Sequence, residues 1–338
     1  SPPRLPPIAF KPPSYDFVKR VRMSRDGRFA AISGHTMVQV PQPIVQLGQT
    51  APAPTPPKYN GVVHLYDAKT GREVDTITIP DAPRMEFDLS ADGRWVVMAK
   101  QDGVAVVWDR DEKKAAAECR GHTGAIHAIA FHPDGAQFAT AGQDSTVRLW
   151  TRDGDEVGSV KHESPVMCLA FDPTGKVLAA GDQRGNVRLW DCESKTTLHE
   201  LTGHYGELLA LSFNGDGSRL ATTSRRGVDQ GWEGDLKVWN VTTGEKTLDI
   251  PAHTWWEADV AFHPTEPHIA MTGKQHTLQV LHAETGQLLL SLPTQGHLCN
   301  TMMFTPDGTR LLVNLAGTPK LIDARPVPQP LASARASK

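Results

Sequence analysis

The chain has 338 residues, of which 39% are hydrophobic and 22% are charged, and its formal net charge is -3. This balance is ordinary for a globular protein and lacks the basic excess typical of nucleic-acid binders. No apolar stretch approaches the roughly 18 residues that a membrane-spanning helix needs, and the 29 glycines and 26 prolines favour an all-β fold with many turns.

Two short motifs recur from residue 15 to residue 323. The first is a turn of the Asp-Gly type, with copies at residues 24–27, 90–93, 132–135, 172–175, 214–217, 263–266 and 305–308. About 15 residues later comes an aromatic or apolar motif, with copies at residues 65–67, 107–109, 149–151, 189–191, 238–240, 281–283 and 321–323. The repeat of roughly 40 to 45 residues is that of a four-stranded propeller blade.

The pattern inside each repeat predicts strands. In the fourth repeat, residues 166–171 form a continuous apolar run, residues 176–180 follow a tight turn, residues 186–190 alternate polar and apolar side chains, and residues 196–201 complete the unit. Such a four-stranded sheet cannot bury both of its faces alone, so neighbouring sheets must stack. Closing the stack into a ring leaves only short, protected edges.

The seven copies resemble the WD-repeat β-propeller family, which is named for the Trp-Asp pair seen at Trp108-Asp109 and Trp190-Asp191. The resemblance covers about residues 8–323 and implies one seven-bladed β-propeller of four-stranded antiparallel blades. The turns at residues 67–71 and 241–244 resemble those of bacterial members. The seventh repeat lacks a fourth strand, and the resemblance implies that a strand at about residues 8–10 completes the last blade.

We therefore expect a Pro-rich N-terminal segment at 1–14, the propeller at 15–323, and a Pro/Ala-rich tail or linker at 324–338. Two insertions interrupt the repeat, at about residues 36–60 in blade one and 225–234 in blade five. Residues 51–57 should be extended polyproline II. The first insertion is either a partner-docking arm or a surface ornament.

The resemblance also implies a hydrogen-bonded structural tetrad within a blade, which gives partners to a buried indole and imidazole. The third repeat matches it at His122, Thr140, Asp144 and Trp150. The other repeats are incomplete. The fourth has Ala180 and Arg184 at two of the places, and in the fifth an insertion disturbs the Asp position. The sixth and seventh keep His253 and His297 but lack the Trp.

A partner should dock on the face that carries the loops before the first strand and between the second and third strands. Several aromatic and charged residues fall in those loops of blades five and six, and such residues dominate interface hot spots. We expect a partner-binding cluster there, formed by Tyr205, Arg225, Arg226, Trp232, Trp255, Trp256 and Glu257. The alternative is that these aromatic rings pack beneath the two long loops.

The resemblance implies a non-catalytic scaffold that binds a protein or peptide through this face, which we call the top. One alternative is a ligand-sensing or regulatory module of a longer signalling protein; a less favoured one is a propeller enzyme with a central-channel site. The sequence shows no HExxH, no GxSxG, no P-loop and no paired carboxylates at a repeated inner position. His127 alone could face the channel, and we expect no cofactor.

The remaining features are expected to be structural. Lys19, Arg20 and Arg22 are the nearest approach to a basic stripe, and we expect them to form a solvated strand face. The four cysteines form no CxxC pair, so we expect buried thiols and no metal site. We expect a soluble monomer that binds neither nucleic acid nor membrane. The cytoplasm is slightly favoured, although the absent start Met leaves export and a longer parent chain open.

Overall fold

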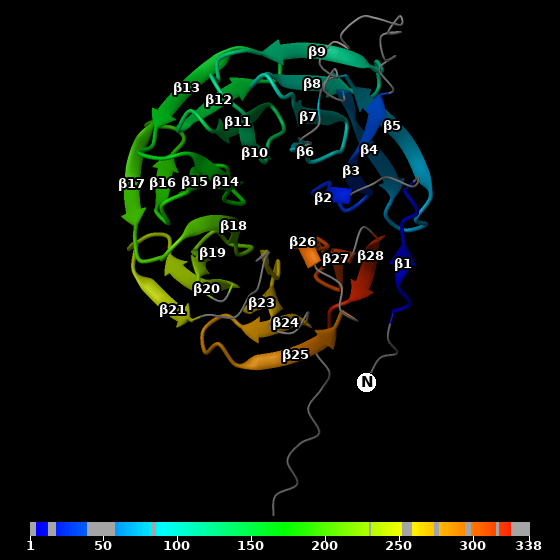
Figure 1. Cartoon of the computed structure of the whole chain (residues 1–338). Coiled ribbons are helices and arrows are strands. Elements are labelled where there is room, and N and C mark those ends of the chain that lie inside the picture. Colours follow the sequence, from blue (N-terminus) through cyan, green and yellow to red (C-terminus); the bar gives the residue numbers. More distant parts are fainter. Residues whose placement is uncertain are drawn as a thin grey trace, which may run out of the picture.

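The computed structural model describes residues 5–12, 18–38, 58–80, 82, 86–229, 231–251, 259–273, 277–294, 299–315 and 318–325. Within these ranges every regular element is a β-strand. The strands form seven antiparallel sheets of four strands each, arranged as the blades of a ring around a central channel (Figure 1). The predicted fold, a seven-bladed β-propeller, is therefore confirmed.

Six blades use four consecutive strands. Blades one to three contain β2 (Val18–Met23), β3 (Phe29–Val38), β4 (Lys58–Asp67) and β5 (Glu73–Ile79); β6 (Phe87–Leu89), β7 (Trp95–Ala99), β8 (Ala105–Asp109) and β9 (Lys114–Cys119); β10 (Ile126–Phe131), β11 (Gln137–Gly142), β12 (Thr146–Thr151) and β13 (Glu156–Lys161). Blades four to six contain β14 (Val166–Phe171), β15 (Val177–Asp182), β16 (Val187–Asp191) and β17 (Thr196–Leu201); β18 (Glu207–Phe213), β19 (Arg219–Val228), β20 (Gly231–Asn240) and β21 (Lys246–Ile250); β22 (Val260–Phe262), β23 (His268–Gly273), β24 (Thr277–His282) and β25 (Leu288–Pro293).

The seventh blade combines the two ends of the chain. It contains β26 (Cys299–Phe304), β27 (Arg310–Leu315), β28 (Thr318–Asp323) and, as its outer strand, β1 (Ile8–Ala9). Ile8 pairs with Leu321, and the amide of Phe10 donates to the carbonyl of Pro319 over 3.1 Å. Phe10 is fully buried in a cluster with residues of blades seven and one. The predicted ring closure by a strand at about residues 8–10 is confirmed.

The hydrophobic core lies between neighbouring blades. One buried cluster, for example, joins Leu65 and Ile77 of blade one to Phe87 and Met98 of blade two. Each sheet is apolar on both faces over its inner strands, so each blade needs two neighbours to remove that surface from water. The ring provides two neighbours for every blade.

Polar contacts also join successive blades. The Nε2–H of His132 donates to the carbonyl of Gly175 over 3.0 Å, and His263 contacts Gly308 in the same way three blades later. Gly175 has φ of +78°, and a Cβ there would lie 2.0 Å from the His132 ring. The turn therefore requires glycine both for its left-handed backbone and for the approach of the neighbouring blade.

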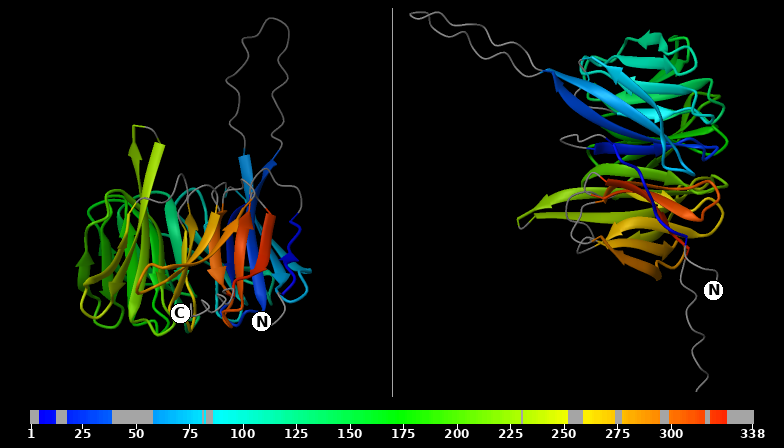
Figure 2. Two further views of the ribbon diagram at one scale, coloured as in Figure 1. Left: turned by 90° about the horizontal axis from the view of Figure 1, so that it is seen from below. Right: turned by 90° about the vertical axis from the view of Figure 1, so that its right-hand side faces the viewer.

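Two hairpins rise from one face of the ring, which is the top face defined above (Figure 2). The β3–β4 ladder extends to Val38 and Lys58, and the β19–β20 ladder extends to Val228 and Gly231. Most of the insertion predicted at residues 36–60, including its proline-rich part, lies outside the described residues. The second insertion lengthens the hairpin of blade five.

Candidate functional site: the top face and the central channel

Blade three holds a chain of four hydrogen-bonded side chains near the top face. The indole N–H of Trp150 donates to Thr140 Oγ1 over 2.8 Å, and the Thr140 hydroxyl donates to His122 Nε2 over 2.8 Å. The His122 Nδ1–H then donates to Asp144 over 3.0 Å. Burial alone would raise the pKa of Asp144, but bonds from Thr123, Thr146 and His122 lower it to about 2.

Blade five contains the same chain of hydrogen-bonded side chains, but its aspartate comes from a different position in the repeat. Trp239 donates to Thr222 over 2.8 Å, Thr222 lies 2.6 Å from His204 Nε2, and His204 Nδ1 lies 2.6 Å from Asp235. Asp235 belongs to β20 and sits opposite Ser224 in the ladder, rather than in a turn between the second and third strands. Asp235 therefore occupies a different position in its repeat from Asp144, yet it bonds to the same atom of its histidine, Nδ1.

Blade four lacks the central hydroxyl. Ala180 occupies the position of Thr140 and Thr222, since it lies opposite Arg188 as Thr140 lies opposite Arg148. Among the described residues, no group bonds to Nε2 of His162, which is buried. Burial lowers the pKa of His162 to about 4, with a further contribution from Arg188.

Four of the predicted partner-binding residues form two pairs at the extended hairpin of blade five. Arg225, Arg226 and Trp232 belong to β19 and β20, and Tyr205 lies in the loop before β18. The guanidinium of Arg226 lies 5.1 Å from the ring centroid of Tyr205, and that of Arg225 lies 4.9 Å from the ring of Trp232. In the β19–β20 ladder Arg226 faces Glu233 while Gly227 faces Trp232. Because successive residues of a strand point to opposite faces, the Tyr205 pair and the Trp232 pair lie on opposite faces of the hairpin.

The Tyr205 side of the hairpin is the more exposed one. Tyr205 has 74% of its surface exposed, whereas Trp232 is half-buried. A cavity of about 100 Å³ lies beside Tyr205, with walls from Arg226, Asp249 and Pro251. At its base Lys237 is buried and bonds to both Asp235 and Asp249, over 2.7 and 2.9 Å.

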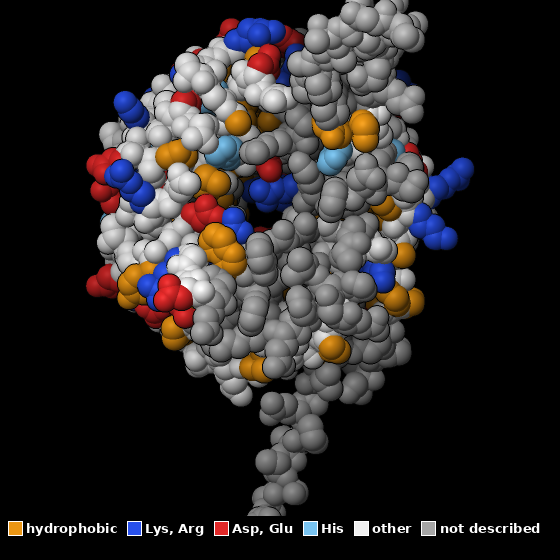
Figure 3. Space-filling model, in the orientation of Figure 1, with side chains coloured by type: hydrophobic (Ala, Val, Ile, Leu, Met, Phe, Trp, Pro, Cys, Tyr) orange, Lys and Arg blue, Asp and Glu red, His pale blue; other side chains and the backbone are white. Residues whose placement is uncertain are grey.

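Trp255, Trp256 and Glu257, the other predicted members of the cluster, lie outside the described residues, as do His253 and His297. The structure therefore brings Tyr205, from the loop before β18, together with Arg225, Arg226 and Trp232 of the β19–β20 hairpin. Figure 3 views the top face and shows acidic, basic and hydrophobic side chains intermixed around the mouth of the channel.

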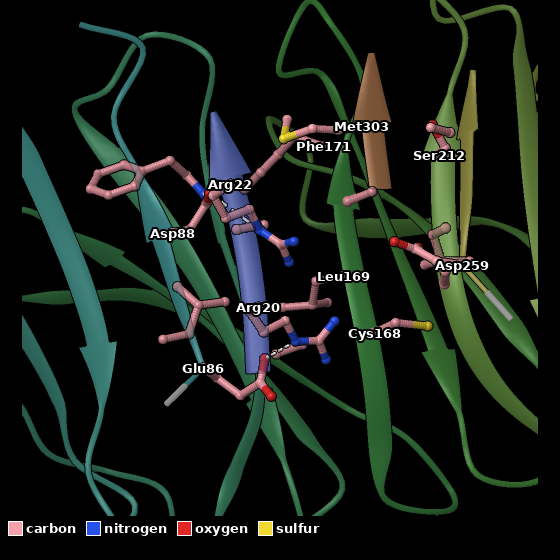
Figure 4. Close-up of a pocket in the computed structure, with 18 of the residues that line it drawn as sticks. Arg20, Arg22, Glu86, Asp88, Cys168, Leu169, Phe171, Ser212, Asp259 and Met303 are labelled. Carbon is pink, nitrogen blue, oxygen red and sulfur yellow. Dashed lines mark hydrogen bonds and ion pairs between the residues drawn. The ribbon is translucent and has the colours of Figure 1, made fainter. Parts of the chain in front are cut away.

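The central channel contains a charged cluster that the sequence reasoning missed. A cavity of about 270 Å³ is lined by residues of the innermost strands, with Arg20, Arg22, Glu86, Asp88 and Asp259 on its wall (Figure 4). Arg20 Nε lies 2.7 Å from Glu86 Oε2, and Arg22 Nε lies 3.7 Å from Asp88 Oδ1. Arg20 and Arg22 thus lie on a half-buried face of β2 that lines the channel.

Glu86 and Asp88 lie two residues apart on one channel wall, in blade two. A search for carboxylates at a position repeated between blades does not select such a pair, because both belong to a single blade. The sequence of the repeats shows where charged side chains replace small ones on the inner strands. Two residues before each Asp-Gly-type turn, blades three and four have Ala130 and Ala170, whereas blades one and two have Arg22 and Asp88. His127 is not among the described residues that line the cavity.

The described part of the chain contains neither a cluster of metal ligands nor a reactive thiol. No group of three His, Cys, Asp or Glu side chains is placed there to hold a metal ion. Burial raises the pKa of Cys119, Cys168 and Cys192 to about 12. At neutral pH these three thiols are protonated and poorly nucleophilic.

A family model described as "WD domain, G-beta repeat" matches residues 113–151, 154–191 and 195–240, which run from the outer strand of blade two to the third strand of blade five. The chain is a WD-repeat β-propeller. Three similar proteins illustrate the relationship. Rat transducin beta-like protein 3 is 27% identical over 64% of the chain, protein hir1 of Emericella nidulans is 23% identical over 57%, and human apoptotic protease-activating factor 1 is 30% identical over 26%.

The propeller corresponds to only part of these relatives, covering 22%, 17% and 7% of their respective lengths. The comparisons give no support to the expected bacterial type, since these relatives come from rat, a fungus and human. WD-repeat propellers are generally non-catalytic scaffolds for protein interactions. In the described part of this propeller, no helix is long and apolar enough to cross a membrane.

Proposed function

We propose that this WD-repeat propeller is a non-catalytic scaffold that binds a protein or peptide through its top face, with the blade-five hairpin as the docking centre. The observation that carries the proposal is Tyr205, a large aromatic side chain that is 74% exposed beneath the guanidinium of Arg226. A partner that covers this ring would remove apolar surface from water.

The composition of the hairpin supports the proposal. Tyr, Trp and Arg are the residue types most enriched in interface hot spots. The stacked arginine also holds the tyrosine ring in one orientation, so less side-chain entropy remains to be lost on binding. The cavity beside Tyr205 offers a recess for one side chain of the partner.

The backbone of the same hairpin supports an extended partner. β20 pairs with β21 only from Leu236 to Trp239, so the outer edge of β20 from Gly231 to Asp235 carries no partner strand within the described sheet. An unpaired strand edge presents N–H and C=O groups to an incoming peptide. Tyr205 and Arg226 line the same cavity as Glu233, Gly234 and Asp235 of β20, and would contact the peptide side chains.

The test is capture of proteins from the source lysate by the immobilised full chain, compared among wild type, Tyr205→Ala, Trp232→Ala and a control, Leu288→Ala. Leu288 is 47% exposed on the outer strand of blade six, away from the top-face hairpin. We expect Tyr205→Ala to reduce the yield of a specific partner at least ~10-fold, as loss of a hot spot would, while Leu288→Ala retains it.

The two hairpin variants also distinguish the two faces of the hairpin. Loss with Tyr205→Ala alone places the partner on the Arg226 side, and loss with Trp232→Ala alone places it on the Arg225 side. A second pair of variants, Trp255→Ala with Trp256→Ala and a deletion of residues 36–58, examines the remaining predicted top-face positions. If every variant captures as much as wild type, the docking site lies elsewhere and the proposal is wrong.

A further inference from the structure

The central channel holds two arginines with unused hydrogen-bond donors. A guanidinium has five N–H donors. Arg20 bonds through Nε to Glu86, and among the described residues its two Nη groups make no hydrogen bond. Arg22 uses Nη1 for the carbonyl of Val21 over 3.1 Å. Figure 4 shows both guanidinium groups pointing across the channel, away from Glu86 and Asp88.

A carboxylate without a cation lies on the other side of the same cavity. Asp259 accepts backbone bonds from Val260 over 2.9 Å and from Met302 over 2.6 Å. No Lys or Arg among the described residues comes within ion-pair distance of it. Burial raises its pKa, which the more distant Arg22 and Arg20 only partly offset. The uncharged wall between these groups includes Cys168, Leu169 and Ser212 (Figure 4).

The channel is narrowed at the end opposite the top face. Arg25, in the turn between β2 and β3, donates through Nη1 to the carbonyl of Pro173 in a turn of blade four, over 3.3 Å. This bond crosses the bottom of the channel from blade one to blade four. On the top face the channel is open, with basic and acidic side chains visible inside it (Figure 3).

The charges on the wall balance. Three arginines (Arg20, Arg22 and Arg25) face three carboxylates (Glu86, Asp88 and Asp259), which gives +3 − 3 = 0 if all six groups are ionised. An anion or a cation bound alone would add a net charge to a narrow site of reduced dielectric constant, which is unfavourable. A molecule with one positive and one negative end adds no net charge and can pair with both sides.

We propose that the channel binds a small zwitterion of the amino-acid type, with its carboxylate on the guanidinium groups of Arg20 and Arg22 and its ammonium on Asp259. Arginine matches a carboxylate through paired N–H donors, and charge-assisted bonds of this kind are the strong ones. The cavity of about 270 Å³ accommodates a molecule of this size together with water. This site lies inside the ring and does not depend on the docking hairpin.

The experiment is isothermal titration of the full chain with three matched series. The first contains ω-amino acids from glycine to 6-aminohexanoate, the second the alkanoates that lack the amine, and the third the alkylamines that lack the carboxylate. We expect one chain length of amino acid to bind at least ~10-fold more tightly than both of its matched partners. Equal binding of the amino acid and the alkanoate, or no binding by any amino acid, would overturn the proposal.

Two variants locate the site. Asp259→Asn should weaken the best amino acid about 10-fold without weakening the matched alkanoate, because only the ammonium loses its partner. Arg20→Gln should weaken both the amino acid and the alkanoate. The control is Arg184→Gln, since Arg184 lies on the surface with its side chain 66% exposed.

Folding of each variant is checked by circular dichroism and by its thermal midpoint. If Asp259→Asn does not fold, Arg20→Gln still decides the question. Binding unchanged by Arg20→Gln would place the ligand outside the channel. Because Tyr205→Ala leaves the channel wall intact, it should keep amino-acid binding even if it loses the protein partner, so failure of one proposal is distinguishable from failure of the other.

Discussion

The Trp, Thr, His and Asp side chains of blades three and five form the same connected chain, and each member satisfies a buried polar group of the next. An unsatisfied buried donor or acceptor costs about 1–3 kcal/mol. Blade four shows what happens when one member is absent, because Ala180 leaves Nε2 of His162 without a described partner. Two predictions follow from this difference.

Ala180→Thr should stabilise the propeller by about 1 kcal/mol, because the new hydroxyl would give His162 Nε2 the bond that Thr140 gives His122. The measurement is the free energy of unfolding in urea. Ala180→Val is the matched control, since valine has the shape of threonine without its hydroxyl. Equal stability of the Thr and Val variants would show that the hydroxyl makes no useful bond there.

His162 should make stability depend on pH between about 6.5 and about 4. Burial lowers its folded pKa to about 4 from an ordinary 6.5, so in this window only the unfolded chain takes up the proton. Stability should therefore fall as the pH falls, by up to roughly 3 kcal/mol in total. In urea titrations across this window, His162→Gln should show a shallower decline; the same slope as wild type would contradict the assignment.

At the scale of elements, two short stretches have effects larger than their length suggests. β1 has only two residues in the sheet, yet it supplies the outer strand of blade seven and brings fully buried Phe10 between the first and last blades. The β19–β20 hairpin projects beyond its sheet, with Arg226 and the adjacent Tyr205 on one face and Arg225 and Trp232 on the other. The first element closes the ring, and the second carries the proposed docking surface.

Phe10→Ala should destabilise the propeller by about 3–5 kcal/mol, because it removes a large buried side chain at the closure. Lys11→Ala, one residue further along and exposed, is the control and should have little effect. Thermal unfolding followed by circular dichroism measures both. A Phe10 variant as stable as the control would mean that the closing strand contributes little to the ring.

At the scale of the whole molecule, ring closure creates both candidate sites. Each blade buries its apolar faces against two neighbours, and the innermost strands are left facing a common axis. Charged side chains at equivalent positions of different blades therefore meet across the channel. The loops and hairpins between the second and third strands of each blade all emerge on one face, which places the docking hairpin and the channel mouth on the same side (Figure 2).

The closing strand and the members of the blade-three tetrad were implied by the resemblance to the WD-repeat family. The sequence by itself determined the number of blades and the four-strand unit. These features depend on local patterns, namely the period of the repeat, the alternation along strands and the Asp-Gly turns, each of which lies within a few tens of residues. Tyr205, Arg225, Arg226 and Trp232 could also be selected from the sequence, because aromatic and basic residues interrupted the repeat there.

Only the tertiary structure decided how these residues are grouped in space. Tyr205 stacks on Arg226 and Trp232 stacks on Arg225, and these two successive residues of β19 point to opposite faces of the hairpin. In blade five Asp235 takes the role that Asp144 has in blade three. Its distance along the sequence differs, but in the folded structure it lies close enough to bond to His204. Arg20, Glu86 and Asp259 come from three blades, and their meeting in the channel follows from closure of the ring, which brings together residues that no local pattern connects.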